Sequence, residues 1–202
     1  MLTQYKDRFR GAADFLARFF IRLGFSPNGL TLLGLAMGLG ACLLFAWNRN
    51  PILFGFLMIF CGLFDFVDGA VARFSGRVTK FGSYLDAVSD RFFEAGAILA
   101  TAFVSGHWTL SFLLLTGMSL VSYTKARAAI EVPISNMEWP DLMERTERDL
   151  IFAAGVISWG CFPGRYWGHD VLFWTFVILN PLVYFTVIQR VLRAKRLIET
   201  RG

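Results

Sequence analysis

Long apolar runs alternate with short charged stretches along the chain, and each run has a length suited to crossing a bilayer. The hydrocarbon core of a bilayer is about 30 Å thick, which takes about 20 apolar residues of helix to cross. The pattern therefore predicts an all-α, polytopic membrane protein with six transmembrane helices. The six apolar runs cover about residues 28–47, 51–73, 81–104, 108–131, 148–163 and 170–192.

The first 25 residues follow a different pattern, because apolar and basic side chains alternate there at helical spacing. We expect an amphipathic helix over residues 5–23 that lies in the headgroup region and does not cross the bilayer. Its apolar positions include Phe9, Ala12, Phe15 and Phe19. Ser26-Pro27-Asn28 then resembles the start of the first membrane helix.

The stretches between the runs are too short to form a second domain, so one membrane domain is expected over residues 1–202. Within it, we expect an interfacial helix over 1–25, a six-helix transmembrane core over 26–193 and a cytoplasmic tail over 194–202.

Composition and charge support a membrane protein and argue against a nucleic-acid partner. Hydrophobic residues make up 55% of the chain and the mean hydropathy is +0.52, whereas a soluble domain has about 45–50% apolar residues even with glycine included. The net charge is +5, but of the 20 Lys and Arg only Arg49 and Arg165 fall outside the segments on the side of the N-terminus. The positive-inside rule then predicts a multi-pass protein of the cell membrane with both termini in the cytoplasm.

Four carboxylates interrupt the apolar sequence at the end of the second run and the start of the third. Asp65 and Asp68 are three residues apart and Asp86 and Asp90 are four apart, so each pair lies on one face of its helix. A charged side chain inside a bilayer costs about 2.5–3.5 kcal/mol, so the four must face a polar cavity. Carboxylate oxygens without nearby His or Cys favour a hard divalent cation, and Mg²⁺ often shares such ligands with substrate phosphates. A phosphorylated or pyrophosphate substrate is therefore expected on the cytoplasmic side.

Small residues stand beside these carboxylates. Gly69 and Ala72 leave one face of the second membrane helix bare, and Arg73 follows within the next turn. Gly82 has the same effect at the start of the third membrane helix. Small side chains let a bulky ligand approach the backbone, so this face is a candidate binding surface.

The combined pattern is D65-x-x-D68-G69-x-x-A72-R73, eight further residues, and G82-x-x-x-D86-x-x-x-D90. It resembles the signature of the CDP-alcohol phosphotransferase family, and the opening S26-P27-N28-x-x-T31 is also similar to that family. The resemblance implies two divalent ions, Mg²⁺ or Mn²⁺, bound by the aspartates against a CDP pyrophosphate. It implies that Asp90, counted among the ligands, is also the general base, and that the enzyme is a homodimer. The CDP-lipid site that it implies comprises Asn28, Thr31, Asp65, Asp68, Gly69, Ala72, Arg73 and Gly82.

Basic residues at three helix ends form a second candidate site, suited to an anionic group such as a phosphate monoester. Its residues are Lys125, Arg127, Arg145, Arg148 and Arg193, with Arg196 as a weaker candidate. The segments around Lys125 and Arg145 are similar to those of the branch of the family that uses inositol phosphate. Cytoplasmic helix ends also gather Lys and Arg for topology alone, so that interpretation stays open.

The resemblance implies transfer of a phosphatidyl or archaetidyl group from CDP-diacylglycerol or CDP-archaeol to a polar alcohol, with release of CMP. Inositol phosphate is the first expectation for the acceptor, and glycerol 3-phosphate, serine or another alcohol is the alternative. A membrane cation transporter is an alternative from a different class, because membrane carboxylates also mark ion paths. The position of the acids at one face, without an inverted repeat, disfavours the transporter.

Overall fold

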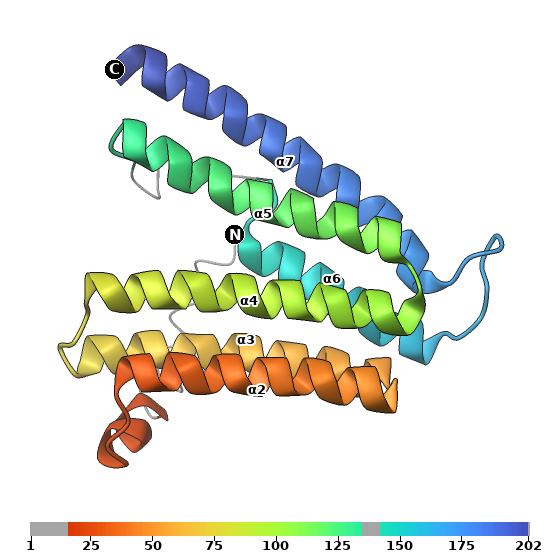
Figure 1. Ribbon diagram of the computed structural model, residues 1–202, viewed down its shortest axis with the longest axis horizontal. Coiled ribbons are helices and arrows are strands. Elements are labelled where there is room, and N and C mark those ends of the chain that lie inside the picture. The colour runs from red at the N-terminus through yellow and green to blue at the C-terminus, as the bar shows by residue number, and fades with distance from the viewer. Residues whose placement is uncertain (1–15, 135–141, 202) are drawn as a thin grey trace. The chain divides into compact units, whose positions relative to one another are not determined.

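The computed structural model describes residues 16–134 and 142–201, and its regular structure over these ranges is almost entirely helical. The predicted all-α fold is confirmed. After a short helical segment at residues 16–22, six helices follow in chain order (Figure 1). They are α2 (Pro27–Asn48), α3 (Pro51–Phe74), α4 (Lys80–Ser105), α5 (Trp108–Glu131), α6 (Arg145–Cys161) and α7 (Val171–Arg201).

The predicted bounds agree closely for four of the six helices and differ for the last two. Helix α6 begins at Arg145, three residues earlier than expected, because Glu144 and Glu147 form a capping box there. Helix α7 continues to Arg201, beyond the predicted end of the last apolar run at residue 192, and the cytoplasmic tail over 194–202 stays a prediction. This stretch is polar but rich in strong helix formers and contains no Gly or Pro before Arg201, so the helix outlasts the apolar run.

Three helices, α2, α3 and α7, are long and apolar enough to cross a membrane over the described residues. Helix α6 has only 17 residues, and α4 contains the charged residues Asp86, Asp90, Arg91 and Glu94. The protein is thus an all-helical membrane protein, and the count of six spans stays a prediction.

Side-chain caps explain where the first helices begin. The Ser26 hydroxyl accepts a hydrogen bond from the Gly29 N–H at 3.1 Å, and the Asn50 side chain accepts one from Leu53 N–H at 3.1 Å. Each cap precedes a proline at the first helical position, where no N–H is needed. The predicted helix start at Ser26-Pro27 is therefore confirmed.

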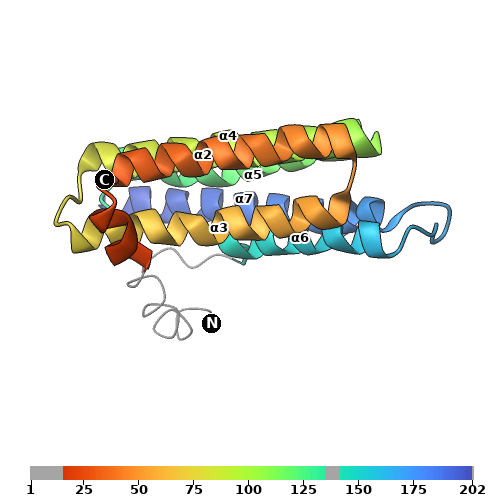
Figure 2. The same cartoon turned by 90° about the horizontal axis from the view of Figure 1, so that it is seen from below.

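The described chain packs as two compact units, of which the first comprises residues 16–44 and 56–97. Within it α2, α3 and α4 run alongside one another (Figures 1 and 2). Its buried core joins the segment 16–22 to α2 and α3 through Ala17, Leu30, Val67, Ala70 and Val71. On another side of α3, large apolar side chains are exposed at helical spacing, as expected for lipid contact: Phe56, Phe60 and Leu63.

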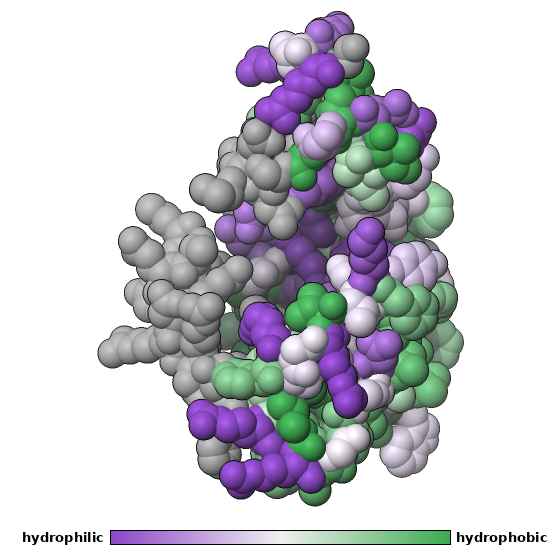
Figure 3. Space-filling model, turned by 90° about the vertical axis from the view of Figure 1, so that its left-hand side faces the viewer, coloured by the Kyte–Doolittle hydropathy of each residue, from purple (hydrophilic) through white to green (hydrophobic). Residues whose placement is uncertain are grey.

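Hydrophilic residues gather at the end of this unit where α3 ends and α4 begins (Figure 3). Helix α3 ends in a Schellman motif, with Gly76 at φ +65° and a hydrogen bond from the Arg77 N–H to Ala72 O at 3.1 Å. Thr79 then caps α4, because its hydroxyl accepts a hydrogen bond from Gly82 N–H at 2.9 Å. This short connection makes α3 and α4 antiparallel, so the C-terminal end of α3 and the start of α4 share one polar end.

The second unit comprises residues 45–55 and 98–201 without 135–141. Helix α7 packs along α5 and against α6. Glycines permit the close approach, since a Cβ at Gly117 would lie 2.8 Å from Val183 Cγ1 and one at Gly155 would lie 2.3 Å from Thr175 Cγ2. The buried Asn180 amide donates hydrogen bonds to Leu110 O and Phe176 O, which ties α7 to α5 beside Pro181.

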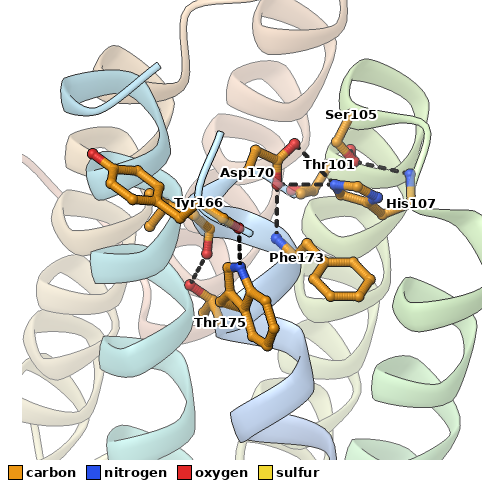
Figure 4. Close-up of polar contacts among 9 residues, drawn as sticks. Thr101, Ser105, His107, Tyr166, Asp170, Phe173 and Thr175 are labelled. Carbon is orange, nitrogen blue, oxygen red and sulfur yellow. Dashed lines mark hydrogen bonds and ion pairs between the residues drawn. The ribbon is translucent and has the colours of Figure 1, made fainter. Parts of the chain in front are cut away.

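A polar cluster fixes the connection that leads into α7 (Figure 4). Asp170 caps α7 by accepting a hydrogen bond from Phe173 N–H at 2.8 Å, and both of its carboxylate oxygens lie 3.0 Å from His107 Nε2. The Trp174 indole N–H donates to Tyr166 O at 2.9 Å. These contacts anchor the loop before α7 to the start of α5, within one unit.

Candidate active site

Three aspartates come together where the C-terminal half of α3 meets the start of α4. Asp65 and Asp68 lie one helical turn apart on α3, and Asp86 faces them from α4 because the two helices are antiparallel. One carboxylate oxygen from each lies within 4.8 Å of the others. Asp68 is buried and the other two are half-buried. Three converging carboxylates at this spacing are a donor set that a hard divalent cation prefers.

Asp90 lies one turn beyond Asp86 on α4 and is half-buried. Among the described residues, the group of converging ligand atoms comprises Asp65, Asp68 and Asp86 and does not include Asp90. The structure thus brings three of the four predicted ligands together and places the fourth on the same helix face, further along α4. This separation suits a carboxylate whose main role differs from that of the other three.

Thr31 connects α2 to the aspartates. Its hydroxyl lies 2.7 Å from Asp68 Oδ2 and 3.2 Å from Pro27 O, and the side chain is buried. Since a hydroxyl has one proton, the shorter contact indicates donation to the carboxylate. The predicted CDP-lipid residue Thr31 therefore holds a candidate metal ligand in position.

Asn28 and Gly82, both predicted in the CDP-lipid site, are also brought together. A Cβ built on Gly82 would lie 3.1 Å from Asn28 Oδ1 and 3.1 Å from Thr79 Oγ1. Both distances are shorter than an ordinary van der Waals contact, so a side chain at position 82 would press on both neighbours. Glycine at position 82 thus allows the start of α4 to approach the start of α2.

The face at Gly69 is open, as the sequence predicts. Among the described side chains, a Cβ there would meet the Arg73 guanidinium alone, whose Nη1 would lie 3.5 Å away. Arg73 itself is exposed and Ala72 is half-buried. A long, flexible cation therefore lies over a bare helix face beside the aspartates, which suits an anionic ligand that lies along α3.

Basic residues of the second unit form a separate group. Lys125 of α5 and Arg190 of α7 line a hollow of about 410 Å³. The remaining lining residues are Ser122, Ala126, Ala129 and Ile134. Arg190 is 7% exposed and donates a hydrogen bond to Val121 O. Sequence reasoning missed Arg190, although an arginine inside the last apolar run is the signal that could have found it.

The other predicted acceptor residues differ in their surroundings. Arg148 is 1% exposed and its Nη1 donates a hydrogen bond to Met143 O at 3.3 Å. A basic residue that only sets membrane topology does not need to be buried in this way. Arg145 lies 3.5 Å from Asp149, and Arg193 is half-buried. Arg127 pairs with Glu131 at 2.6 Å, and both side chains are about half exposed. Among the described residues, Arg127 is not one of those that line the hollow shared by Lys125 and Arg190.

The sequence model of the CDP-alcohol phosphatidyltransferase family matches residues 25–188, and the chain belongs to this family. It is therefore an enzyme, a transferase for substituted phosphate groups that acts in phospholipid biosynthesis. The matched range includes every predicted aspartate, and family membership sets aside the cation transporter.

Relatives of similar length include two inositol-phosphate enzymes. The chain is 31% identical over 201 residues to archaetidylinositol phosphate synthase of Pyrococcus horikoshii, with 98% of this chain and 99% of the relative covered. It is 32% identical over 192 residues to phosphatidylinositol phosphate synthase of Mycobacteroides abscessus, with 92% and 84% covered.

Solved structures of phosphatidylinositol phosphate synthase from Mycobacterium tuberculosis share the fold. The structure with bound CDP-DAG superposes with a TM-score of 0.79 at 26% identity and covers 90% of this chain and 92% of that one. The structure in complex with manganese and citrate gives a TM-score of 0.80 at 25% identity and covers 90% and 88%.

Proposed function

We propose that this enzyme transfers a phosphatidyl or archaetidyl group from a CDP-activated lipid to inositol phosphate and releases CMP. The observation that carries the proposal is the convergence of Asp65, Asp68 and Asp86 within 4.8 Å, beside the open face at Gly69. Three acids alone repel one another and fit a phosphorylated substrate only together with a cation. A CDP pyrophosphate supplies oxygen atoms for the same cation, and its nucleotide can lie along the bare face of α3.

The residues fit a hard divalent cation, because every converging donor is a carboxylate oxygen and Thr31 fixes one of them. Asp65, Asp68 and Asp86 would hold Mg²⁺ or Mn²⁺, with two ions as the expected number and Asp90 next along α4. A bound divalent ion lowers the charge on a pyrophosphate and so favours departure of CMP. The manganese complex of the mycobacterial relative is consistent with this metal class.

We assign Asp90 as the general base. In the transfer, the acceptor hydroxyl oxygen forms a bond to the lipid-bearing phosphorus while the bond from that phosphorus to the CMP oxygen breaks. The hydroxyl proton passes to the Asp90 carboxylate, and CMP leaves with the electron pair. Asp90 lies one turn beyond Asp86 on α4, next to the converging ligands, and this position supports its assignment as the base.

Inositol phosphate is favoured as the acceptor because both named relatives use an inositol phosphate headgroup in their products. Lys125, Arg148 and Arg190 are the cations that we assign to its phosphate, since two line a hollow and the third is buried. Glycerol 3-phosphate, which also carries a phosphate monoester, is the runner-up, and serine fits these cations less well. CDP-diacylglycerol and CDP-archaeol remain alternative donors.

We further propose that the protein is one membrane domain with the active site and both termini on the cytoplasmic side, and that it works as a homodimer. The basic residues on that side support the orientation. The acids lie in the halves of α3 and α4 that are nearest to the connection between these two helices.

A direct assay tests the proposal. Purified protein is incubated with CDP-diacylglycerol or CDP-archaeol, Mg²⁺, and inositol phosphate, inositol, glycerol 3-phosphate or serine in turn, and CMP release is measured. We expect CMP only with a phosphorylated acceptor and fastest with inositol phosphate. Equal rates with inositol and inositol phosphate would contradict the acceptor assignment, and full activity in excess chelator would contradict the metal assignment.

A further inference from the structure

We infer that the N-terminal segment 16–22 positions the aspartate cluster, with Ala17 and Phe20 as its two positioning residues. The inference rests on the proposed role of the aspartates as metal ligands. The segment lies outside the range that the family model matches, and we assign it a part in metal binding through its packing against α3.

The turn after this segment fixes where Phe20 lies. Gly24 has φ +80°, its N–H bonds to Ile21 O at 3.0 Å, and the Phe25 N–H bonds to Phe20 O at 3.1 Å. This is a Schellman motif, which is commonly accompanied by an apolar contact between the two residues of the longer hydrogen bond. The Phe20 and Phe25 rings make that contact, with centroids 5.7 Å apart and planes at 88°.

Phe20, which this turn holds in place, also contacts α3. Its ring meets the Phe64 ring edge to face, with centroids 5.6 Å apart. Phe64 immediately precedes Asp65 and lies one turn before Asp68. The ring contact therefore acts at the part of α3 that presents both aspartates.

Ala17 allows the segment to lie close against the same part of α3. It is completely buried and belongs to one core cluster with Leu30, Val67, Ala70 and Val71. Val67 and Val71 flank Asp68 along α3, and Leu30 precedes Thr31, which bonds Asp68. One small packed core thus supports both the carboxylate and the hydroxyl that orients it. Nearby, the Arg18 guanidinium lies 5.9 Å from the centre of the Phe74 ring, at the end of α3.

Leu23, in the turn that directly follows the segment, provides a matched control because its side chain is largely exposed. Leu23 is 58% exposed and Leu16 is 41% exposed. Truncating Leu23 changes the apolar surface of the segment without touching the contacts to α3.

The test measures Mn²⁺ affinity directly, from the electron paramagnetic resonance signal of free Mn²⁺ titrated with purified protein in detergent, without substrate. Ala17→Leu, Phe20→Ala and the milder Phe20→Leu are compared with Leu23→Ala and the unchanged protein. Removing a group that is hydrogen-bonded to a metal ligand weakens metal affinity by about 10- to 100-fold. A substitution that disturbs the packing one layer further from the metal should therefore weaken it by about three- to tenfold. We expect this loss in Ala17→Leu and Phe20→Ala, a smaller loss in Phe20→Leu, and none in Leu23→Ala.

The Mn²⁺ concentration that half-activates CMP release should rise in the same order, while KM for the acceptor stays constant. A merely structural role would lower the amount of folded protein and leave the affinity of the folded molecules unchanged. Unchanged Mn²⁺ affinity in Ala17→Leu and Phe20→Leu would overturn the inference. Asp68→Asn separates the two proposals: if that variant binds Mn²⁺ as the unchanged protein does, the aspartate assignment itself fails.

Discussion

The Thr31 hydroxyl of α2 donates a hydrogen bond of 2.7 Å to Asp68 Oδ2 of α3, and both side chains are buried. The two residues are 37 positions apart in the chain, so the bond fixes the position of α2 relative to the aspartates. A carboxylate that accepts a hydrogen bond from a hydroxyl rotates less, and it is therefore held in one orientation for metal binding.

Thr31→Val should therefore weaken metal binding while the fold persists, because Val has the same shape without the hydroxyl. We expect Mn²⁺ affinity to fall by about 10- to 100-fold, measured by titration without substrate. Thr31→Ser keeps the donor and should retain affinity to within about threefold. If Val and Ser behave alike, the hydroxyl has no part in orienting Asp68.

The aspartates should separate into two kinetic classes. Asp65→Asn, Asp68→Asn and Asp86→Asn each remove a converging ligand and should abolish both Mn²⁺ binding and turnover. Asp90→Asn should retain most of the Mn²⁺ and CDP-lipid affinity but lose kcat by about 10²- to 10⁴-fold, the usual contribution of a general base. A near-normal kcat for Asp90→Asn would place the base elsewhere, and lost metal affinity would make Asp90 a ligand first.

Bulk on the bare face of α3 should exclude the donor. Gly69→Leu should weaken CDP-lipid binding, measured in a nucleotide displacement assay, although Leu favours helix by about 1 kcal/mol over Gly. Gly62→Leu on the same helix is the matched control, because a Cβ at Gly62 meets no atom of the described side chains within 4 Å and Gly62 is exposed. If the two substitutions had equal effects on CDP-lipid binding, the donor would not bind at this face of α3.

The sequence contains most of the information on this aspartate site because the relevant contacts follow from helical periodicity. The spacing of Asp65 and Asp68 and the short, capped connection from Gly76 to Thr79 are local features, and together they require Asp86 to face α3. Four acidic side chains in an apolar run are costly to insert into a bilayer, so their presence there indicates a functional site. Spacing alone does not separate Asp90 from the other three, because it does not show which carboxylates converge on one point; only the family resemblance implied a different role for Asp90.

Contacts between distant segments were harder to predict. Nothing local in the sequence indicates that Phe20 meets Phe64, or that Lys125 shares its hollow with Arg190 and not with Arg127. Both depend on how whole helices pack. The length of α7 does not follow from the apolar run for another reason, because apolar content marks the membrane span whereas helix propensity continues into the polar stretch up to Arg201.

The last prediction concerns the acceptor phosphate and uses two cations that are two residues apart on α5. Lys125 lines the hollow with the buried Arg190, whereas Arg127 is about half exposed and pairs with Glu131. Replacing Lys125 by Gln removes a charge-assisted hydrogen bond worth about 1.5–3 kcal/mol, so acceptor KM should rise about ten- to a hundredfold with little change in donor KM.

Arg127→Gln should change acceptor KM by less than about threefold, because an exposed ion pair contributes little. Inorganic phosphate should compete with the acceptor in the unchanged enzyme and lose that effect in Lys125→Gln. Its lack of any effect against the CDP-lipid would show that donor and acceptor phosphates bind separately. If Lys125→Gln and Arg127→Gln have the same small effect, the cations of this helix end serve membrane topology, and the acceptor phosphate binds elsewhere.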